Sequence, residues 1–181
     1  MNKKQLTIIL IIVIAALSRL LPHAPNFTPL TAIALFSGAY IANRLLAIAL
    51  PLLVMLLSDA IMGFNGWAFT EQIVTVYGTY ALISVVSTWF LSHKSAVRVG
   101  SSSLLASLLF FLTTNLAVWM GGFFHAPALY PMNLGGIIEC YIAALPFFGN
   151  ALAGDLFYSA VLFGGFYLLS INIPALARER K

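Results

Sequence analysis

The sequence predicts an all-α membrane protein, a single bundle of six transmembrane helices with the N and C termini in the cytoplasm. Of its 181 residues, 61% are hydrophobic and only 8% are charged, whereas soluble proteins carry roughly 25% charged residues. The apolar residues form six runs, and one bilayer crossing needs about 20 of them. The runs therefore use most of the chain, and residues 1–181 are expected to form one integral membrane domain.

The positions of the cationic residues predict the orientation of this bundle. The connections 22–29, 63–71 and 122–134 contain no Lys or Arg. Eight of the nine Lys and Arg residues lie where alternation places the cytoplasm: Lys3, Lys4, Arg44, Lys94, Arg98, Arg178, Arg180 and Lys181. Because cytoplasmic loops are enriched in these residues, both termini are expected there. The short connections favour a bacterial inner membrane, and the net charge of +4 is attributed to orientation, with no nucleic-acid partner.

The expected helices follow from the apolar runs and from the residues that end them. The first run ends at Pro22, and the connection 22–29 holds three prolines, so it is expected to be stiff and extended. Pro146 interrupts the last apolar stretch, which predicts a short helix before it and a span after it. Spans are expected at about residues 6–21, 30–42, 45–62, 72–92, 101–121 and 148–170, with the short helix at about 137–145.

Polar side chains within the predicted spans, where burial in a bilayer is costly, and in or beside the outer connections are the candidates for function. They are concentrated in the half of the bundle that faces away from the cytoplasm. The aromatic candidates are expected to stack on a planar ligand, and the others to supply charge and hydrogen bonds. The candidate substrate-binding residues are Arg19, His23, Asn26, Asp59, Trp67, Asn115, Trp119, Tyr130, Glu139 and Asp155.

Several of these residues admit a second interpretation. Arg19 is expected to form an ion pair with Asp59 or with Asp155, which would stabilise the bundle and is compatible with a cavity. Asn115 fits a hydrogen bond between helices as well as a ligand contact. His23 and His125 are potential metal ligands, but no third ligand is identifiable, so no metal site is predicted.

The chain lacks the short motifs of several enzyme classes. It contains no Gly-x4-Gly-Lys-Ser/Thr loop, no His-Glu-x2-His pair and no Gly-x-Ser-x-Gly elbow. We therefore expect neither nucleotide hydrolysis by this chain nor another enzymatic activity, and no cofactor is predicted.

Two segments resemble a known family. Residues 28–63 and 144–155 are similar to helices two, three and six of the substrate-binding S components of energy-coupling-factor vitamin transporters. The resemblance implies six helices, an outward-facing vitamin site lined by helices four to six and capped by the first and third outer loops, and docking to a coupling membrane subunit with ATPases. The chain also resembles a narrower bacterial membrane family through Arg19-x2-Pro-His-x-Pro-Asn26, Ser58-Asp59 and Thr114-Asn115, which implies no particular activity.

The docking motif of the S components is missing from its usual place. It is an Ala-x3-Ala pair in helix one, whereas Ala15-Ala16 has no small partner four residues on. The nearest stripe of small residues, and so the expected partner-docking surface, is Ala34, Gly38 and Ala42 in the second span. A solitary protein that works without a coupling subunit is the alternative.

These observations predict a membrane protein that binds a small vitamin-like molecule for uptake. A transporter of a metal cation or small ion, using Asp59, Asp155 and the two histidines, is the alternative. An intramembrane enzyme and a scaffold for other membrane proteins are further alternatives. The expected partners are the small molecule, the lipid bilayer and, if the chain docks, a coupling subunit.

Overall fold

In the computed structural model, residues 3–63, 71–124 and 127–177 are described, and their regular structure is entirely helical. Three short turns continue these helices: η1 (Ser18–Leu20) after α1, η2 (Gly121–Phe123) after α5, and a π-helical turn, η3 (Ala160–Gly164), after α6. The helices are α1 (Lys3–Leu17), α2 (Leu30–Tyr40), α3 (Arg44–Ile61), α4 (Glu71–Phe90), α5 (Ala96–Met120), α6 (Leu134–Ser159), α7 (Gly165–Asn172) and α8 (Pro174–Ala177).

Four helical segments of the described chain are long and apolar enough to cross a membrane: Arg44–Ile61, Gln72–Phe90, Ala96–Phe123 and Leu134–Asn172. The apolar α2 has only 11 residues. The predicted all-α class is confirmed, and the four segments fit a multi-pass membrane protein. Six crossings and a cytoplasmic location of the termini stay predictions.

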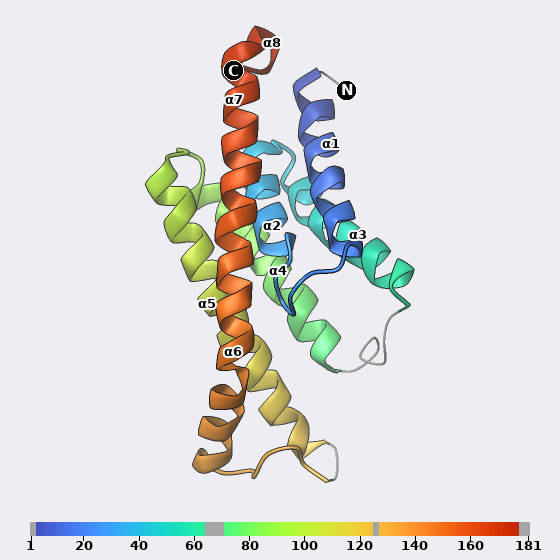
Figure 1. Cartoon of the computed structure of the whole chain (residues 1–181), viewed down its shortest axis with the longest axis vertical. Helices are drawn as coiled ribbons and strands as arrows, with labels where there is room; N and C mark the ends of the chain where they lie inside the picture. Colours follow the sequence, from blue (N-terminus) through green and yellow to red (C-terminus); the bar gives the residue numbers. More distant parts are fainter. Residues whose placement is uncertain (1–2, 64–70, 125–126, 178–181) are drawn as a thin grey trace.

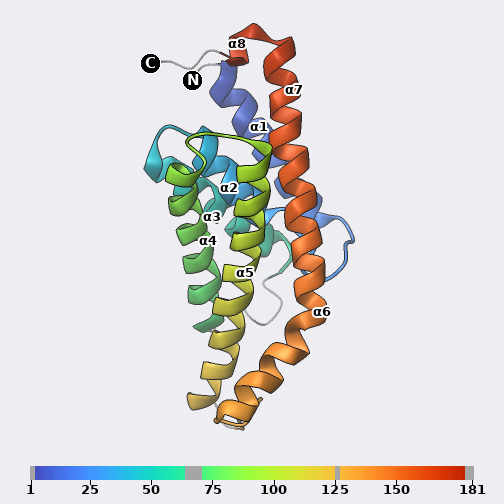
Figure 2. The ribbon, with the colours of Figure 1, turned by 90° about the vertical axis from the view of Figure 1, so that its left-hand side faces the viewer.

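The helices run along one long axis, and α1 begins at the end where α7 and α8 finish (Figures 1 and 2). The turn between α2 and α3 and the connection between α4 and α5 also lie toward this end (Figure 1). There the Lys94 ammonium lies 5.0 Å from the centre of the Tyr40 ring. The cations that begin α1, α3 and α5 or follow α4 are thus gathered at one end, as the orientation argument expects.

The short helix α2 is the centre of the bundle. Every residue from Leu30 to Gly38 is buried, so α2 has no face toward the surroundings, as expected for a helix that is apolar on all sides. The Phe36 ring packs edge-on against Phe163 of η3 at 5.2 Å between ring centres. The Ser37 hydroxyl donates to the Ala47 carbonyl at 2.9 Å and so joins α2 to α3.

Two helices begin earlier than predicted because of their N-terminal caps. The Ser95 hydroxyl accepts from the Arg98 backbone N–H at 3.2 Å, so α5 starts at Ala96 and not near residue 101. The Asn133 side chain accepts from the Gly136 backbone N–H at 3.0 Å and starts α6 at Leu134. Such caps satisfy backbone donors that the first helical turn leaves unpaired.

The predicted break at Pro146 is wrong. Pro146 lies inside α6, and helical structure continues from Leu134 to Asn172 over 39 residues. A proline removes one backbone hydrogen bond, but in apolar surroundings a full break would leave many more groups unpaired. Figure 2 shows instead that α6 bends in its N-terminal half, the half that contains Pro146. The expected helix at 137–145 and span at 148–170 are therefore parts of one continuous helix.

The small-residue stripe, whose docking role stays a prediction, lies mostly inside the bundle. Ala34 and Gly38 are buried, and only Ala42, beyond the end of α2, is exposed. A Cβ atom on Gly38 would lie 1.7 Å from the Ser87 hydroxyl oxygen and 2.7 Å from the Ser84 carbonyl oxygen of α4. The stripe does permit a close helix contact, but this contact lies within the bundle.

Replacing Gly38 with Ala should therefore destabilise the protein by about 1–3 kcal/mol, since the new methyl group overpacks the contact between α2 and α4. Gly78→Ala in α4 is the matched control, because nothing lies within 4 Å of a Cβ there. The free energy of unfolding in detergent micelles measures both. Equal stability of the two variants would contradict the close packing of α2 on α4.

Candidate functional site

A cavity of about 200 Å³ lies between the N-terminal half of α2 and the helices around it. Its walls come from η1, the connection before α2, and helices α2, α3, α4, α5 and α6. Two of its side chains are charged, Arg19 and Asp155, and five are polar or aromatic. The lining residues are Arg19, Asn26, Thr28, Leu30, Thr31, Met55, Val76, Tyr80, Phe110, Ala151 and Asp155.

Arg19 forms a buried ion pair with Asp59 at the end of α3. Its Nη1 lies 2.7 Å from Asp59 Oδ1, and the two side chains are 9% and 1% exposed. The same Nη1 donates to the Ser58 hydroxyl, which donates to the Met55 carbonyl at 2.9 Å. Of the two predicted partners, Asp59 and not Asp155 therefore forms the ion pair with Arg19. All these contacts within the described chain use Nη1. The remaining N–H groups of the guanidinium can therefore donate hydrogen bonds to a molecule in the cavity.

The second carboxylate oxygen of Asp59 is also occupied. It accepts a hydrogen bond from the Tyr77 hydroxyl of α4 at 3.0 Å. Asp59 therefore joins η1, α3 and α4, and it does not line the cavity itself. Its predicted role as a ligand contact is replaced by an indirect one, in which it holds Arg19 at the cavity wall.

Asp155 is held differently, by hydroxyl groups alone. Its Oδ2 accepts from Ser107 of α5 at 2.5 Å, and Thr31 of α2 is a further hydrogen-bonding neighbour. Among the described residues no cationic side chain lies within ion-pair distance of it. With 4% of its surface exposed, Asp155 is a buried carboxylate at a cavity wall with no opposite charge paired to it. An ionisable group of this kind within an apolar bundle marks a functional site.

The connection between α1 and α2 closes one side of the cavity. Asn26 has φ of 64°, a left-handed conformation that Asn tolerates better than most residues, and the resulting bend places Asn26 and Thr28 on the cavity. The Phe27 ring packs against Phe157 and Tyr158 of α6 at 5.8 and 5.7 Å between ring centres.

Gly154 makes this close approach possible. A Cβ on Gly154 would lie 3.1 Å from both the Phe27 Cα and the Thr28 backbone nitrogen. A glycine next to Asp155 therefore lets a non-helical segment press against α6. The two adjacent residues thus have different roles: Gly154 permits the close packing, and Asp155 places a carboxyl group at the cavity.

A second, smaller cavity of about 120 Å³ shares three lining residues with the first: Asn26, Phe110 and Ala151. It adds the polar side chains of Ser107, Thr114 and Asn115 and the aromatic rings of Phe111, Phe147 and Phe148. Asn115 donates from Nδ2 to the Phe111 carbonyl of its own helix at 2.8 Å. It also lines this cavity, and among the described residues the hydrogen bond of its side chain is to its own helix and not to another one.

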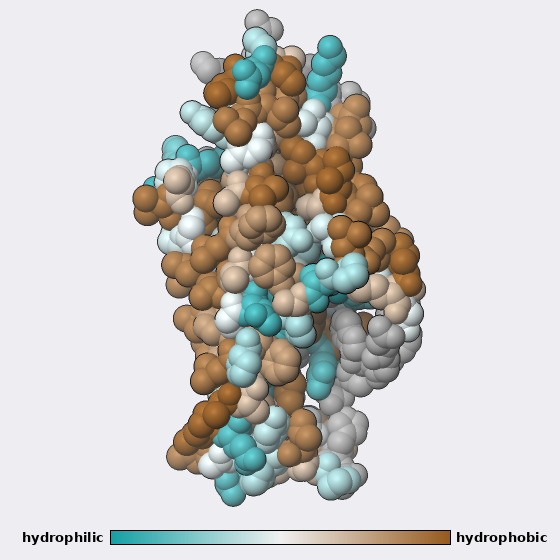
Figure 3. Space-filling view, viewed as in Figure 1, coloured by the Kyte–Doolittle hydropathy of each residue, from teal (hydrophilic) through white to brown (hydrophobic). Residues whose placement is uncertain are grey.

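The polar connection is visible on the molecular surface. Figure 3 shows a mostly apolar exterior interrupted by a hydrophilic patch at mid-height, over the connection between α1 and α2 and the adjoining part of α6. The exposed side chains there include His23 and Asn26. Asn26, which also lines the cavity, thus connects this surface with the cavity wall.

The other predicted site residues lie away from these two cavities. His23 is exposed, and its Nδ1 lies 2.6 Å from the Leu21 carbonyl oxygen. Trp119 donates from Nε1 to the Pro131 carbonyl at 3.0 Å. Glu139 is exposed on α6 and Tyr130 lies in the connection before it; none of the four lines either cavity. Trp67 and His125 fall outside the described residues.

A metal centre receives no support from the described residues, since no three His, Cys, Asp or Glu side chains among them come together. Asp59 is committed to Arg19, and His23 is not near Asp155 in either cavity. The alternative function of a metal-cation transporter is therefore supported by the sequence alone.

Sequence reasoning missed several members of the site. Thr31, Tyr80 and Phe110 lie inside apolar helical runs, where a core role is the ordinary assignment. Ser107 looked like one of many serines near the start of α5. A weak signal was present: Thr28 and Thr31 lie on either side of Pro29-Leu30, at the start of a mostly apolar helix.

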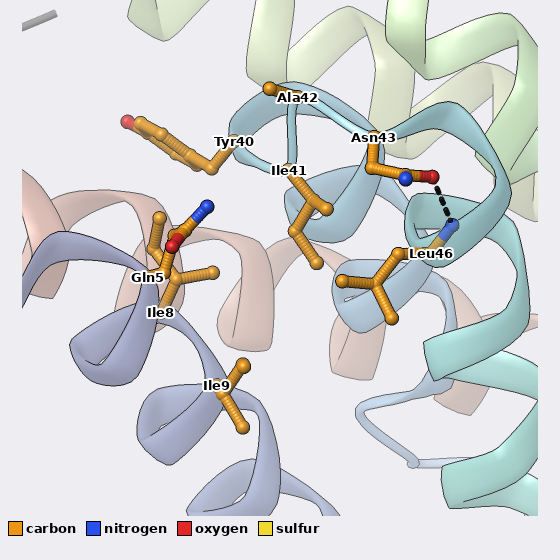
Figure 4. A pocket seen from close by; sticks show the side chains of 8 residues that line it. All are labelled: Gln5, Ile8, Ile9, Tyr40, Ile41, Ala42, Asn43 and Leu46. Carbon is orange, nitrogen blue, oxygen red and sulfur yellow. Dashed lines mark hydrogen bonds between the residues drawn. The ribbon is translucent and has the colours of Figure 1, made fainter. Parts of the chain in front are cut away.

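A third cavity, of about 210 Å³, lies at the other end of α2 (Figure 4). It is bounded by Gln5, Ile8 and Ile9 of α1, by the turn after Tyr40, and by Leu46 of α3, whose N–H donates to Asn43 Oδ1 at 3.0 Å. Its lining carries no charged side chain, so nothing in it would orient a charged ligand. The cavity at Asp155 is therefore the better candidate for a specific site.

The chain belongs to a family of unknown function, DUF6580, which matches residues 1–176. A search of curated proteins and of solved structures finds no match to the chain. The family assignment covers the fold and the site together, and it names no activity.

Replacing Asp59 with Asn should destabilise the protein by about 3–5 kcal/mol, because the Arg19 charge would remain buried without its partner. Glu139→Gln removes an exposed carboxylate and is the matched control, with an expected change below about 0.5 kcal/mol. Unfolding in detergent measures both, and the double variant Arg19→Met with Asp59→Leu should recover much of the loss. A single variant as stable as the control would show that the pair does not hold the bundle together.

Proposed function

We propose that this chain is a multi-pass membrane protein that binds a small vitamin-like molecule in the cavity at Asp155 and serves its uptake. The observation that carries the proposal is the cavity itself, where a guanidinium group and an unpaired buried carboxylate face one space of about 200 Å³. Buried charge that serves only stability is normally paired within the protein. A carboxylate left for a ligand is the pattern of a binding site.

The backbone before α2 supports the same proposal. With 11 residues, α2 is about 16 Å long and cannot cross a hydrocarbon layer of about 30 Å. Non-helical backbone at membrane depth is tolerated where it is buried in protein or lines a polar cavity. The end of the connection 21–29 meets this condition, because Asn26 and Thr28 line the cavity and Phe27 packs against α6, whereas residues 21–25 are exposed.

The orientation in the proposal follows the cations. Their end of the bundle would face the cytoplasm of a bacterial cell, and the connections 21–29 and 121–133 would face outward. In the S-component arrangement that the sequence resembles, the molecule would be captured from outside. Binding of a coupling subunit with ATPases is a further part of the proposal. The stripe of small residues does not support this part, because Ala34 and Gly38 are buried.

Blocking the cavity tests ligand binding. Ala151 lines both connected cavities, so Ala151→Phe should fill the shared space, whereas Ala153→Phe on the exposed face of the same helix should not. Mass spectrometry of gently purified protein should find one small molecule per chain in the wild type and the control, and at least ten-fold less in Ala151→Phe. Equal retention by all three proteins would contradict binding in this cavity.

Labelling of single cysteines tests the orientation. In a Cys140→Ala background, Ala128→Cys should react with a membrane-impermeant maleimide in intact cells, because the connection between α5 and α6 is expected outside. Ser92→Cys, in the connection between α4 and α5, should react only after the cells are opened. Both native residues are exposed, so the reverse pattern would show the opposite orientation.

A further inference from the structure

The charges around the cavity are unbalanced, and this imbalance specifies the ligand. Arg19 and Asp155 are the charged residues that line it. The charge of Arg19 is compensated by Asp59 at 2.7 Å, whereas Asp155 has only hydroxyl neighbours in the described chain. Asp155 therefore has no compensating cation within the described chain, and a bound cation would stabilise the ionised form of its carboxyl at short range.

The hydrogen bonds to Asp155 leave room for a further donor. The Ser107 hydroxyl has a single hydrogen, and it lies 2.5 Å from Asp155 Oδ2 and 2.9 Å from the Ser103 carbonyl oxygen. Two acceptors thus compete for one proton. A carboxylate has about four acceptor positions, so a charged N–H donor would find unused capacity at Asp155.

The remaining walls favour an organic cation over a metal ion. Tyr80 and Phe110 line the same cavity, with 5.0 Å between their ring centres, and aromatic faces attract ammonium groups through their negative quadrupole. Leu30, Met55 and Val76 add apolar surface, which cannot replace the oxygen ligands of a small inorganic ion. Carboxylate plus aromatic rings is the chemistry that recognises a protonated or quaternary amine.

The adjoining cavity indicates the rest of the molecule. It shares Asn26, Phe110 and Ala151 with the first and is bounded by Phe111, Phe147 and Phe148. Such a lining suits a flat apolar group attached to the cationic end. Asn115 and Thr114 provide hydrogen-bonding groups at its edge.

We infer that the ligand is a small organic cation whose ammonium group binds Asp155 in the cavity that Tyr80 and Phe110 also line, and whose aromatic or apolar part enters the cavity lined by Phe111 and Phe148. This inference rests on the proposed function and adds the chemical class of the substrate to it. Asp155 would hold the ammonium group, and Arg19, the other charged residue of the lining, is compensated by Asp59.

Three probes of similar size and different charge test the inference on the unmodified full-length chain in detergent. Calorimetric titration with 2-phenylethylammonium should show binding at least ten-fold tighter than with 2-phenylethanol, and phenylacetate should bind weakest. Asp155→Asn should reduce the affinity for the ammonium probe at least ten-fold, whereas Glu139→Gln on the exposed face of the same helix should not change it.

Several outcomes would overturn the inference. Equal affinity for the three probes, preference for phenylacetate, a response to sodium chloride alone, or no binding of the ammonium probe each contradict it. The comparison of probes on the wild-type chain holds even if Asp155→Asn fails to fold. The mass spectrometry that compares the wild type with Ala151→Phe also identifies the molecule that the wild type retains. If that molecule is neutral or anionic, the proposed function stands and the inferred substrate class is wrong.

Discussion

The length of α2 is the constraint on which the rest of this structure depends. Its 11 residues span about half of a hydrocarbon layer, so if α2 is part of a crossing, a non-helical segment must continue the path at the same depth. The backbone of that segment needs polar partners or water. The chain meets this need by surrounding α2 with other helices and by pressing the connection 21–29 against Gly154 of α6. The polar space that results is the cavity at Asp155.

The two carboxylates near this space have opposite roles because their neighbours differ. Asp59 is enclosed by Arg19 and Tyr77 and is fully committed to the protein, so its charge contributes to cohesion among η1, α3 and α4. Asp155 is held by Ser107, with Thr31 as a further neighbour, and lines the cavity without a paired cation in the described chain. A single chain thus contains one carboxylate committed to an internal ion pair and one carboxyl group without a paired cation in the described chain, and the second is the basis of the inference that the ligand is cationic.

Much of the fold was predictable from local patterns, and the site only in part. The apolar runs and the distribution of Lys and Arg predict helices and a common cationic end, which the structure shows in Figure 1. The prediction at Pro146 failed because a proline within an apolar segment bends a helix more readily than it breaks one. Arg19, Asn26, Asn115 and Asp155 were recognisable as cavity residues because they are costly in a bilayer. Tyr80, Phe110 and Thr31 were not recognisable, because in a single sequence such cavity residues cannot be told from ordinary core residues. Only tertiary packing brings them to Asp155. The same packing buried Ala34 and Gly38, which spacing alone had placed on a docking surface.

The central claim is that the space between Asp155, Tyr80 and Phe110 holds a ligand. An experimentally determined structure of the gently purified protein, at a resolution that shows small molecules, tests it most directly. The account predicts density for a compact molecule in this space, with a donor atom about 2.7–3.0 Å from an Asp155 oxygen. A space closed by the protein's own side chains, or filled by a lipid chain that makes no contact with Asp155, would contradict it.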